Sequence, residues 1–80
     1  MMENPVQLDQ IRPKATLKIC EINGGHGLKQ KLQVMGIRDG QKRFLGSKQP
    51  IRGPLTIKVN EREITIGRGM AKKIMVEVIS

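Results

Sequence analysis

One short helix signal stands in otherwise strand-like sequence, and this feature most constrains the fold. Residues 24–37 read GGHGLKQKLQVMGI, in which Leu28, Leu32 and Met35 recur at the i, i+4, i+7 spacing of one helix face. Glycines precede this run, and Gly36 follows it, where a glycine can take positive φ and end a helix. We predict one amphipathic helix over about residues 27–35, with Ile37 packing back over its last turn. A helix this short must dock one face on the rest of the chain.

The remaining sequence has the period-two alternation of strands. We predict strands over residues 14–22, 41–46, 55–59, 62–66 and 74–79. Ile22 breaks the alternation of the first strand, which indicates a bulge or a rim position there. Asn60 and Glu61 form the turn between the third and fourth strands, and Glu61 adopts positive φ poorly, so we expect a longer or differently shaped turn.

Short connecting segments complete the outline. Residues 8–11 are predicted to form one helical turn, residues 47–54 a loop and residues 67–73 a glycine-bounded corner. Residues 1–7 are predicted to be a flexible tail of a single domain over residues 1–80. About five short strands with one helix after the first indicate a mainly β fold, a closed or nearly closed small barrel.

Composition limits both the core and the location of the protein. Phe44 is the one aromatic residue, so the core must come from Ile, Leu, Val and Met, and we place Phe44 in that core too. The single cysteine, Cys20, cannot form an internal disulfide, which fits a reducing compartment. No apolar run approaches the ~20 residues that span a bilayer, and the first residues lack a signal-peptide layout. We therefore expect a cytoplasmic protein without direct membrane insertion.

The residues that carry chemistry are few. No catalytic constellation is visible, so we expect no enzyme and no cofactor. Cys20, Glu21 and His26 could contribute metal ligands, but a structural zinc site wants four Cys or His ligands and this chain has two, so Cys20 and His26 are only weak metal candidates. The glycines of residues 24–27 could expose backbone N–H groups to an anion, although the simpler role is to turn the chain from strand to helix.

A formal charge of +8 favours an anionic partner. Nucleic-acid sites usually interleave basic and aromatic side chains, and with Phe44 assigned to the core a nucleic-acid partner is disfavoured. Recognition of a protein remains, through the helix and its flanks. The predicted partner-binding residues are Lys29, Lys31, Met35, Ile37, Arg38 and Met70. The oligomeric state is left open, including self-association through an exposed edge.

Several short motifs, taken in order, resemble one known family. They are Leu8 with Ile11 before a proline, Gly24–Gly25 and Gly27 before Leu28, Met35–Gly36–Ile37, Gly53–Pro54, and Ile66–Gly67–Arg68 with Ala71, Ile74 and Val76. Over about residues 8–78 the chain resembles the FeoA family, small cytosolic proteins of the ferrous iron transport system.

The resemblance implies an SH3-like β-barrel with a helix inserted after the first strand. It also implies a non-enzymatic accessory role in ferrous iron uptake and binding to the cytosolic region of FeoB, the membrane ferrous iron transporter. The same fold occurs as a domain of iron- and manganese-dependent repressors. A nucleic-acid-binding barrel, suggested by the charge, and a metal-responsive module that uses Cys20 and His26 stay as alternatives.

Overall fold

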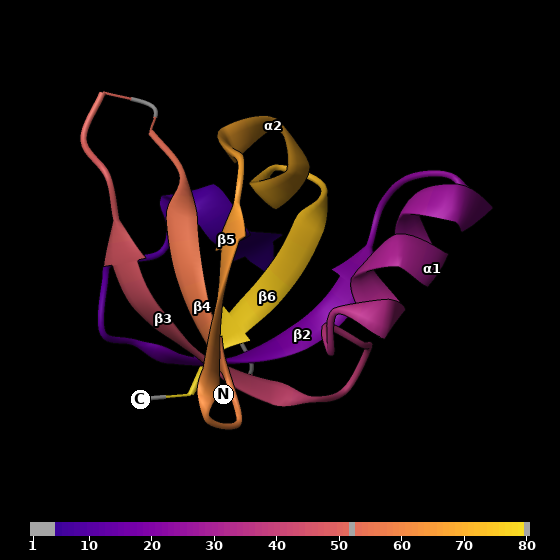
Figure 1. The fold of residues 1–80 in the computed structure, drawn as a ribbon, viewed down its shortest axis with the longest axis horizontal. Coiled ribbons are helices and arrows are strands. Elements are labelled where there is room, and N and C mark those ends of the chain that lie inside the picture. The colour runs from indigo at the N-terminus through magenta and orange to yellow at the C-terminus, as the bar shows by residue number, and fades with distance from the viewer. Residues whose placement is uncertain (1–4, 52, 80) are drawn as a thin grey trace.

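The chain folds into one curved antiparallel sheet (Figure 1). The sheet encloses a core of aliphatic side chains. The structure is a computed structural model, and it describes residues 5–51 and 53–79. The strands are β1 (Val6–Gln7), β2 (Thr16–Ile22), β3 (Lys42–Lys48), β4 (Leu55–Val59), β5 (Arg62–Ile66) and β6 (Ile74–Val78). The helices are the 3-10 turn η1 (Leu8–Gln10), α1 (His26–Val34) and α2 (Arg68–Ala71). The predicted mainly β fold with one short α-helix after the first long strand is confirmed.

The strand order is β1-β6-β2-β3-β4-β5, and every neighbouring pair is antiparallel. Within residues 5–51 and 53–79, the two edge strands β1 and β5 do not pair with each other, so the curved sheet is open rather than a closed barrel.

Strand β1, which was not predicted, corrects the prediction of a flexible tail at Val6 and Gln7. These two residues pair with β6 in the register Val6↔Val76 and Gln7↔Met75. Two residues are too few to show an alternation, so the sequence carries no signal for β1. Residues 1–4 of the predicted tail lie outside the described residues.

The inner face of the sheet is lined by the strand residues that the alternation predicted. Leu17 and Ile19 on β2, and Ile57 on β4, have no exposed surface. The ends of the core are filled from outside the sheet by Leu8, Ile11, Leu32, Ile37 and Ala71. Burial of these side chains is the main force holding a chain of this size together.

The C-terminus of α1 has the geometry that we predicted from Gly36. Gly36 has φ +93°, its N–H donates to the Gln33 carbonyl at 3.0 Å, and the Ile37 N–H donates to the Leu32 carbonyl at 2.8 Å. This pair of bonds is a Schellman motif, in which the residue after the glycine packs on the last turn. Ile37 is accordingly fully buried against the core.

Local irregularities fall close to where the sequence placed them. The β2–β6 register shifts between Ile19 and Glu21, which confirms the predicted bulge near the end of β2. The first strand begins at Thr16 rather than at Lys14, because Lys14 has φ +71° and cannot continue a strand.

The turn between β4 and β5 is shorter than expected. Val59 pairs directly with Arg62, so the connection holds only two residues. Positive φ falls on Asn60 (+57°) and not on Glu61, so the residue that tolerates this conformation takes it. Of the two expected outcomes, the longer turn was wrong and the differently shaped turn is confirmed, because a type I′ turn needs positive φ at both central residues and only Asn60 has it.

Phe44 does not lie in the core. The β3–β4 register sets Leu45 opposite Ile57, on the inner face, and Phe44 opposite Lys58, on the outer face. Neighbouring residues of a strand point to opposite faces, so only one of Phe44 and Leu45 could be buried. Leu45 is buried and Phe44 is 36% exposed.

Candidate functional site

Basic side chains lie on α1 and on the segment after it, and α1 carries one exposed apolar side chain. Lys31 and Arg38 are exposed and Lys29 is half-buried, while α1 contains no acidic residue. Val34 in the last turn of α1 is 83% exposed. We call Lys29, Lys31, Val34 and Arg38 the α1 surface. An isolated apolar group among cations is typical of the edge of a protein contact rather than of a core.

Val34 was not among the predicted contact residues, although its exposure could have been predicted from the sequence. It does not belong to the i, i+4, i+7 stripe of Leu28, Leu32 and Met35, so the periodicity that buries the stripe leaves Val34 outside.

The three apolar residues among the predicted contact residues are buried or half-buried. Ile37 has no exposed surface, so its assignment as a contact residue was wrong, because its position in the Schellman motif packs it under the helix. Met35 and Met70 are half-buried and pack against the core. Met70 lies on α2, which is the predicted corner between β5 and β6 (Figure 1).

Arg43 fixes the end of α1 against the sheet. Its Nε and Nη2 both donate to the Gly36 carbonyl, at 3.0 and 2.7 Å, and Nη2 also donates to Gln41 Oε1 at 2.6 Å. A guanidinium that bonds one carbonyl with two nitrogens holds it in a defined direction. The α1 surface is therefore positioned by a side chain from β3, although sequence patterning gave no sign of this.

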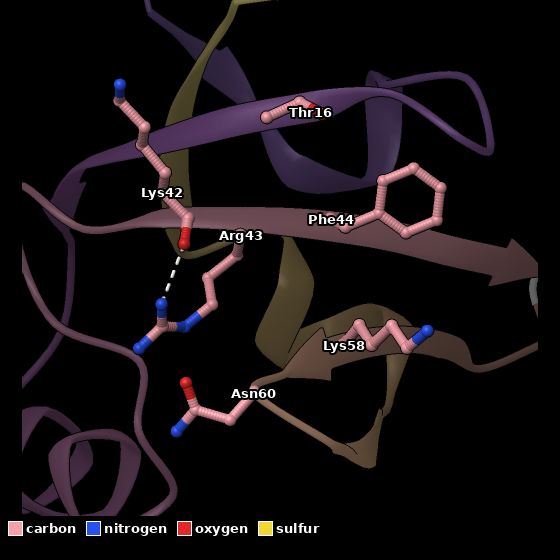
Figure 2. A pocket seen from close by; sticks show the side chains of 6 residues that line it. All are labelled: Thr16, Lys42, Arg43, Phe44, Lys58 and Asn60. Carbon is pink, nitrogen blue, oxygen red and sulfur yellow. Dashed lines mark hydrogen bonds between the residues drawn. The ribbon is translucent and has the colours of Figure 1, made fainter.

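A shallow hollow lies on the outer face of the sheet, and Phe44 is one of the residues that line it (Figure 2). Its volume is about 300 Å³, and its lining comes from three adjacent strands and the β4–β5 turn. The lining residues are Thr16, Lys42, Arg43, Phe44, Lys58 and Asn60. This hollow could not be predicted from the sequence once Phe44, one of its lining residues, had been assigned to the core.

The two weak metal candidates lie on different elements. Cys20 is half-buried on β2, and its thiol donates a weak bond to the Lys18 carbonyl at 3.7 Å. Burial raises the pKa of the Cys20 thiol, the charge of Glu77 adds to this, and Lys18 acts in the opposite direction. His26 is the first residue of α1 and is exposed. Within residues 5–51 and 53–79, no three His, Cys, Asp or Glu side chains are grouped so as to hold a metal ion.

Gly24, before α1, lets the backbone lie close to the Leu28 side chain. Gly24 has φ +155°, and a Cβ there would lie 2.6 Å from Leu28 Cδ2. The Gly25 carbonyl then accepts the first bonds of the helix, from Leu28 and Lys29 N–H. This geometry supports the turning role for Gly24 and leaves the anion hypothesis as a prediction.

No helix in the described part of the chain is long and apolar enough to cross a bilayer.

Comparison with known proteins places the chain in a family. The sequence model of the FeoA domain matches residues 6–78. The chain is 44% identical over 59 residues to a protein of Methanocaldococcus jannaschii that bears the provisional name Fe(2+) transport protein A, an alignment covering 74% of this chain and 70% of that protein.

Solved structures agree with this assignment. A crystal structure of an iron uptake regulatory protein, FeoA, superposes with a TM-score of 0.85 at 32% identity, covering 94% of this chain and 99% of that one. A manganese-dependent transcriptional repressor superposes at 0.82 with 16% identity, over 94% of this chain and 42% of the repressor, which shows a shared fold alone. The fold class is thus the SH3-like one, and the chain belongs to the FeoA family.

Proposed function

We propose that this protein is a non-enzymatic, cytoplasmic accessory protein of ferrous iron uptake that binds the cytosolic region of a FeoB-type membrane transporter. The single observation that carries the proposal is the match to the FeoA domain over residues 6–78. The relative from Methanocaldococcus jannaschii, whose name refers to Fe(2+) transport, supports the same role.

The α1 surface is the contact that we assign to this partner. Its cations are unopposed on the helix itself, so they would attract an acidic surface from a distance and orient the encounter. Val34 adds an apolar group that loses water only once the two surfaces touch. Charge therefore acts mainly on the association rate, and Val34 mainly on the dissociation rate.

The contact is held rigid by the sheet rather than by the helix alone. Arg43 ties the α1 C-terminus to β3, and Leu32 and Ile37 anchor it in the core. A surface that is already ordered needs little further ordering on binding, which preserves affinity.

Surface plasmon resonance with the immobilised cytosolic region of the transporter tests the proposal. Reversal of two charges, Lys29→Glu with Lys31→Glu, should slow association by about 10-fold at low salt. The effect should fade as salt shortens the screening length from about 10 Å at 0.1 M to about 3 Å at 1 M. Val34→Ser should speed dissociation with little effect on association.

A matched control makes the result specific to this surface. Lys72 and Lys73 are exposed beyond α2, so Lys72→Glu with Lys73→Glu changes the net charge by the same amount elsewhere. If the control pair slows association as much as the α1 pair, the attraction is a property of net charge and α1 is not the contact. If neither wild type nor variants bind, the proposed partner is wrong.

A further inference from the structure

The outer face of β2, β3 and β4 sets one aromatic ring among cations. Thr16 pairs with Phe44, and Phe44 pairs with Lys58, so these three side chains form one row across the sheet. Lys18 pairs with Lys42 in the adjacent row. We call Thr16, Lys18, Lys42, Phe44, Lys58 and Asn60 the Phe44 face. Figure 2 shows the ring standing between Thr16 of β2 and Lys58 of β4.

The spacing of this face is set by sheet geometry. Directly paired residues have Cβ atoms about 4.5–5.5 Å apart, and residues two apart on a strand lie about 6.6–6.8 Å apart along it. Lys58 lies directly across from Phe44 on the neighbouring strand. Lys42 lies two residues before Phe44 on the same strand, and its side chain is the next one on the same face. Figure 2 shows the Lys58 side chain beside the ring and the Lys42 side chain extending away from it, so a ligand has to continue along β3 beyond the ring to meet both ammonium groups.

The cations of this face are only partly neutralised by neighbours. Glu63 pairs with Lys58 and Glu77 pairs with Lys18. Lys42 instead has another lysine, Lys18, directly opposite it. Like charges in this position destabilise a sheet, so an anion held between them would relieve a repulsion that the unliganded fold contains.

The hollow favours a ligand that is flat, polar at its edges and negatively charged. Phe44 is the one apolar side chain of its lining, so an apolar peptide anchor would find a single contact and several unpaired polar groups. A nucleobase instead stacks on a ring through its face and hydrogen-bonds through its edge, for which the Thr16 hydroxyl and the Asn60 amide are available.

We propose that the Phe44 face binds single-stranded nucleic acid, with a base stacked on Phe44 and neighbouring phosphates on Lys42, Lys58 and Lys18. The interleaving of an aromatic residue with lysines on a sheet is the arrangement used by sheet-based single-strand binders. The hollow is shallow, which suits a strand passing over it better than an enclosed small molecule. One ring supplies one stacking position, so the binding is weak and strongly dependent on salt.

Fluorescence anisotropy with a labelled oligothymidylate of about eight nucleotides, a length within the usual site sizes, tests this proposal. The logarithm of the affinity should fall with the logarithm of salt with a slope of about −2, since three lysines each contribute about 0.7 on a single strand. Phe44→Leu keeps an apolar side chain but removes the ring, and it should weaken binding at least about 5-fold. Lys42→Glu should weaken binding and make the slope shallower.

Two further measurements separate the alternatives. Lys72→Glu is the matched charge control, because Lys72 is exposed and outside the Phe44 face, and it should leave most of the affinity. Polyglutamate of equal charge should compete poorly, because it offers charge without a stacking face. Since Phe44 and Lys42 are exposed, circular dichroism should show both variants folded.

The proposal is overturned by any of four results. These are the absence of binding to wild type at low salt, an unchanged affinity in Phe44→Leu, equal competition by polyglutamate, and equal affinity for a mononucleotide. Equal competition by polyglutamate would indicate an acidic protein surface as the ligand. Equal affinity for a mononucleotide would indicate a small-molecule site.

Discussion

Replacing Gly36 by alanine should destabilise this protein more than the same change at Gly40 or Gly27. Gly36 has φ +93°, and a Cβ at this position would lie 2.7 Å from Val59 Cγ1, a distance that real Cβ atoms do not adopt. Val59 is 1% exposed and belongs to the core, so it has little room to move. The substitution therefore introduces both backbone strain and overpacking.

The two contributions can be given magnitudes. Positive φ in a residue with a Cβ costs about 1–2 kcal/mol, and overpacking a well-filled core costs about 1–3 kcal/mol. A loss near 3 kcal/mol is a large part of the about 4–12 kcal/mol expected for a domain of this length. It corresponds to a fall in Tm of about 12–24 °C.

Two other glycines separate these contributions. Gly40 has φ +84° but nothing within 4 Å of its would-be Cβ, so Gly40→Ala should show the backbone cost alone, about 1–2 kcal/mol. Gly27 lies inside α1, also in open space, and Gly27→Ala should stabilise by up to about 1 kcal/mol through helix propensity.

Urea unfolding followed by circular dichroism measures all three variants on one scale. The expected order of unfolding free energy is Gly27→Ala, wild type, Gly40→Ala and Gly36→Ala, from highest to lowest, with unchanged m-values. If the unfolding free energies of Gly36→Ala and Gly40→Ala differ by less than about 0.5 kcal/mol, the close approach of the new Cβ to Val59 costs nothing, and the packing argument fails.

Arg43, Cys20 and Asp9 each give a further prediction. Arg43→Leu should lower the unfolding free energy by about 1.5 kcal/mol or more by removing the two bonds to the Gly36 carbonyl, and Arg43→Lys about half as much, measured by urea unfolding. The raised pKa of Cys20 leaves less thiolate at pH 8, so iodoacetamide should alkylate Cys20 more slowly than a thiol in the unfolded chain. Glu77→Gln should lower the pKa of Cys20 and speed alkylation. A slower reaction in this variant would contradict the effect assigned to the Glu77 charge. Asp9 is buried, and its Oδ1 has no hydrogen-bond partner within the described residues. Asp9→Asn should therefore leave the unfolding free energy unchanged or raise it by up to about 3 kcal/mol. A loss above about 1 kcal/mol would reveal a partner for the carboxylate.

The sequence predicts best where a local pattern and a local terminator agree. The strands over residues 55–59 and 62–66 match the prediction residue for residue, because alternating Leu, Ile and Val side chains end at a turn residue that tolerates positive φ. The helix is correct to one residue at each end, because Gly36 dictates where it stops. In these segments the information lies within a few neighbouring positions.

The sequence predicts poorly where the outcome depends on a distant strand. Phe44 and Leu45 are adjacent and apolar, and the choice of which one is buried is made by the register with β4. A shift of one residue would have reversed it. Arg43 is similar, since its acceptor at Gly36 belongs to the end of another element. The two candidate surfaces were the hardest features to predict, because contacts between distant parts of the chain decide which of their residues are exposed.

Both proposed surfaces attract anions, so ionic strength alone cannot distinguish them, and the apolar residue of each is the better probe. Val34→Ser and Phe44→Leu leave the net charge at +8, so neither changes long-range attraction. Crossing these two variants with two ligands, the cytosolic region of the transporter and the oligothymidylate, gives four affinities. Independent sites require that Val34→Ser weaken only the transporter complex and Phe44→Leu only the oligonucleotide complex. If each variant weakens both complexes, the two surfaces act as one contact, and the lysines of both surfaces then serve a single acidic partner.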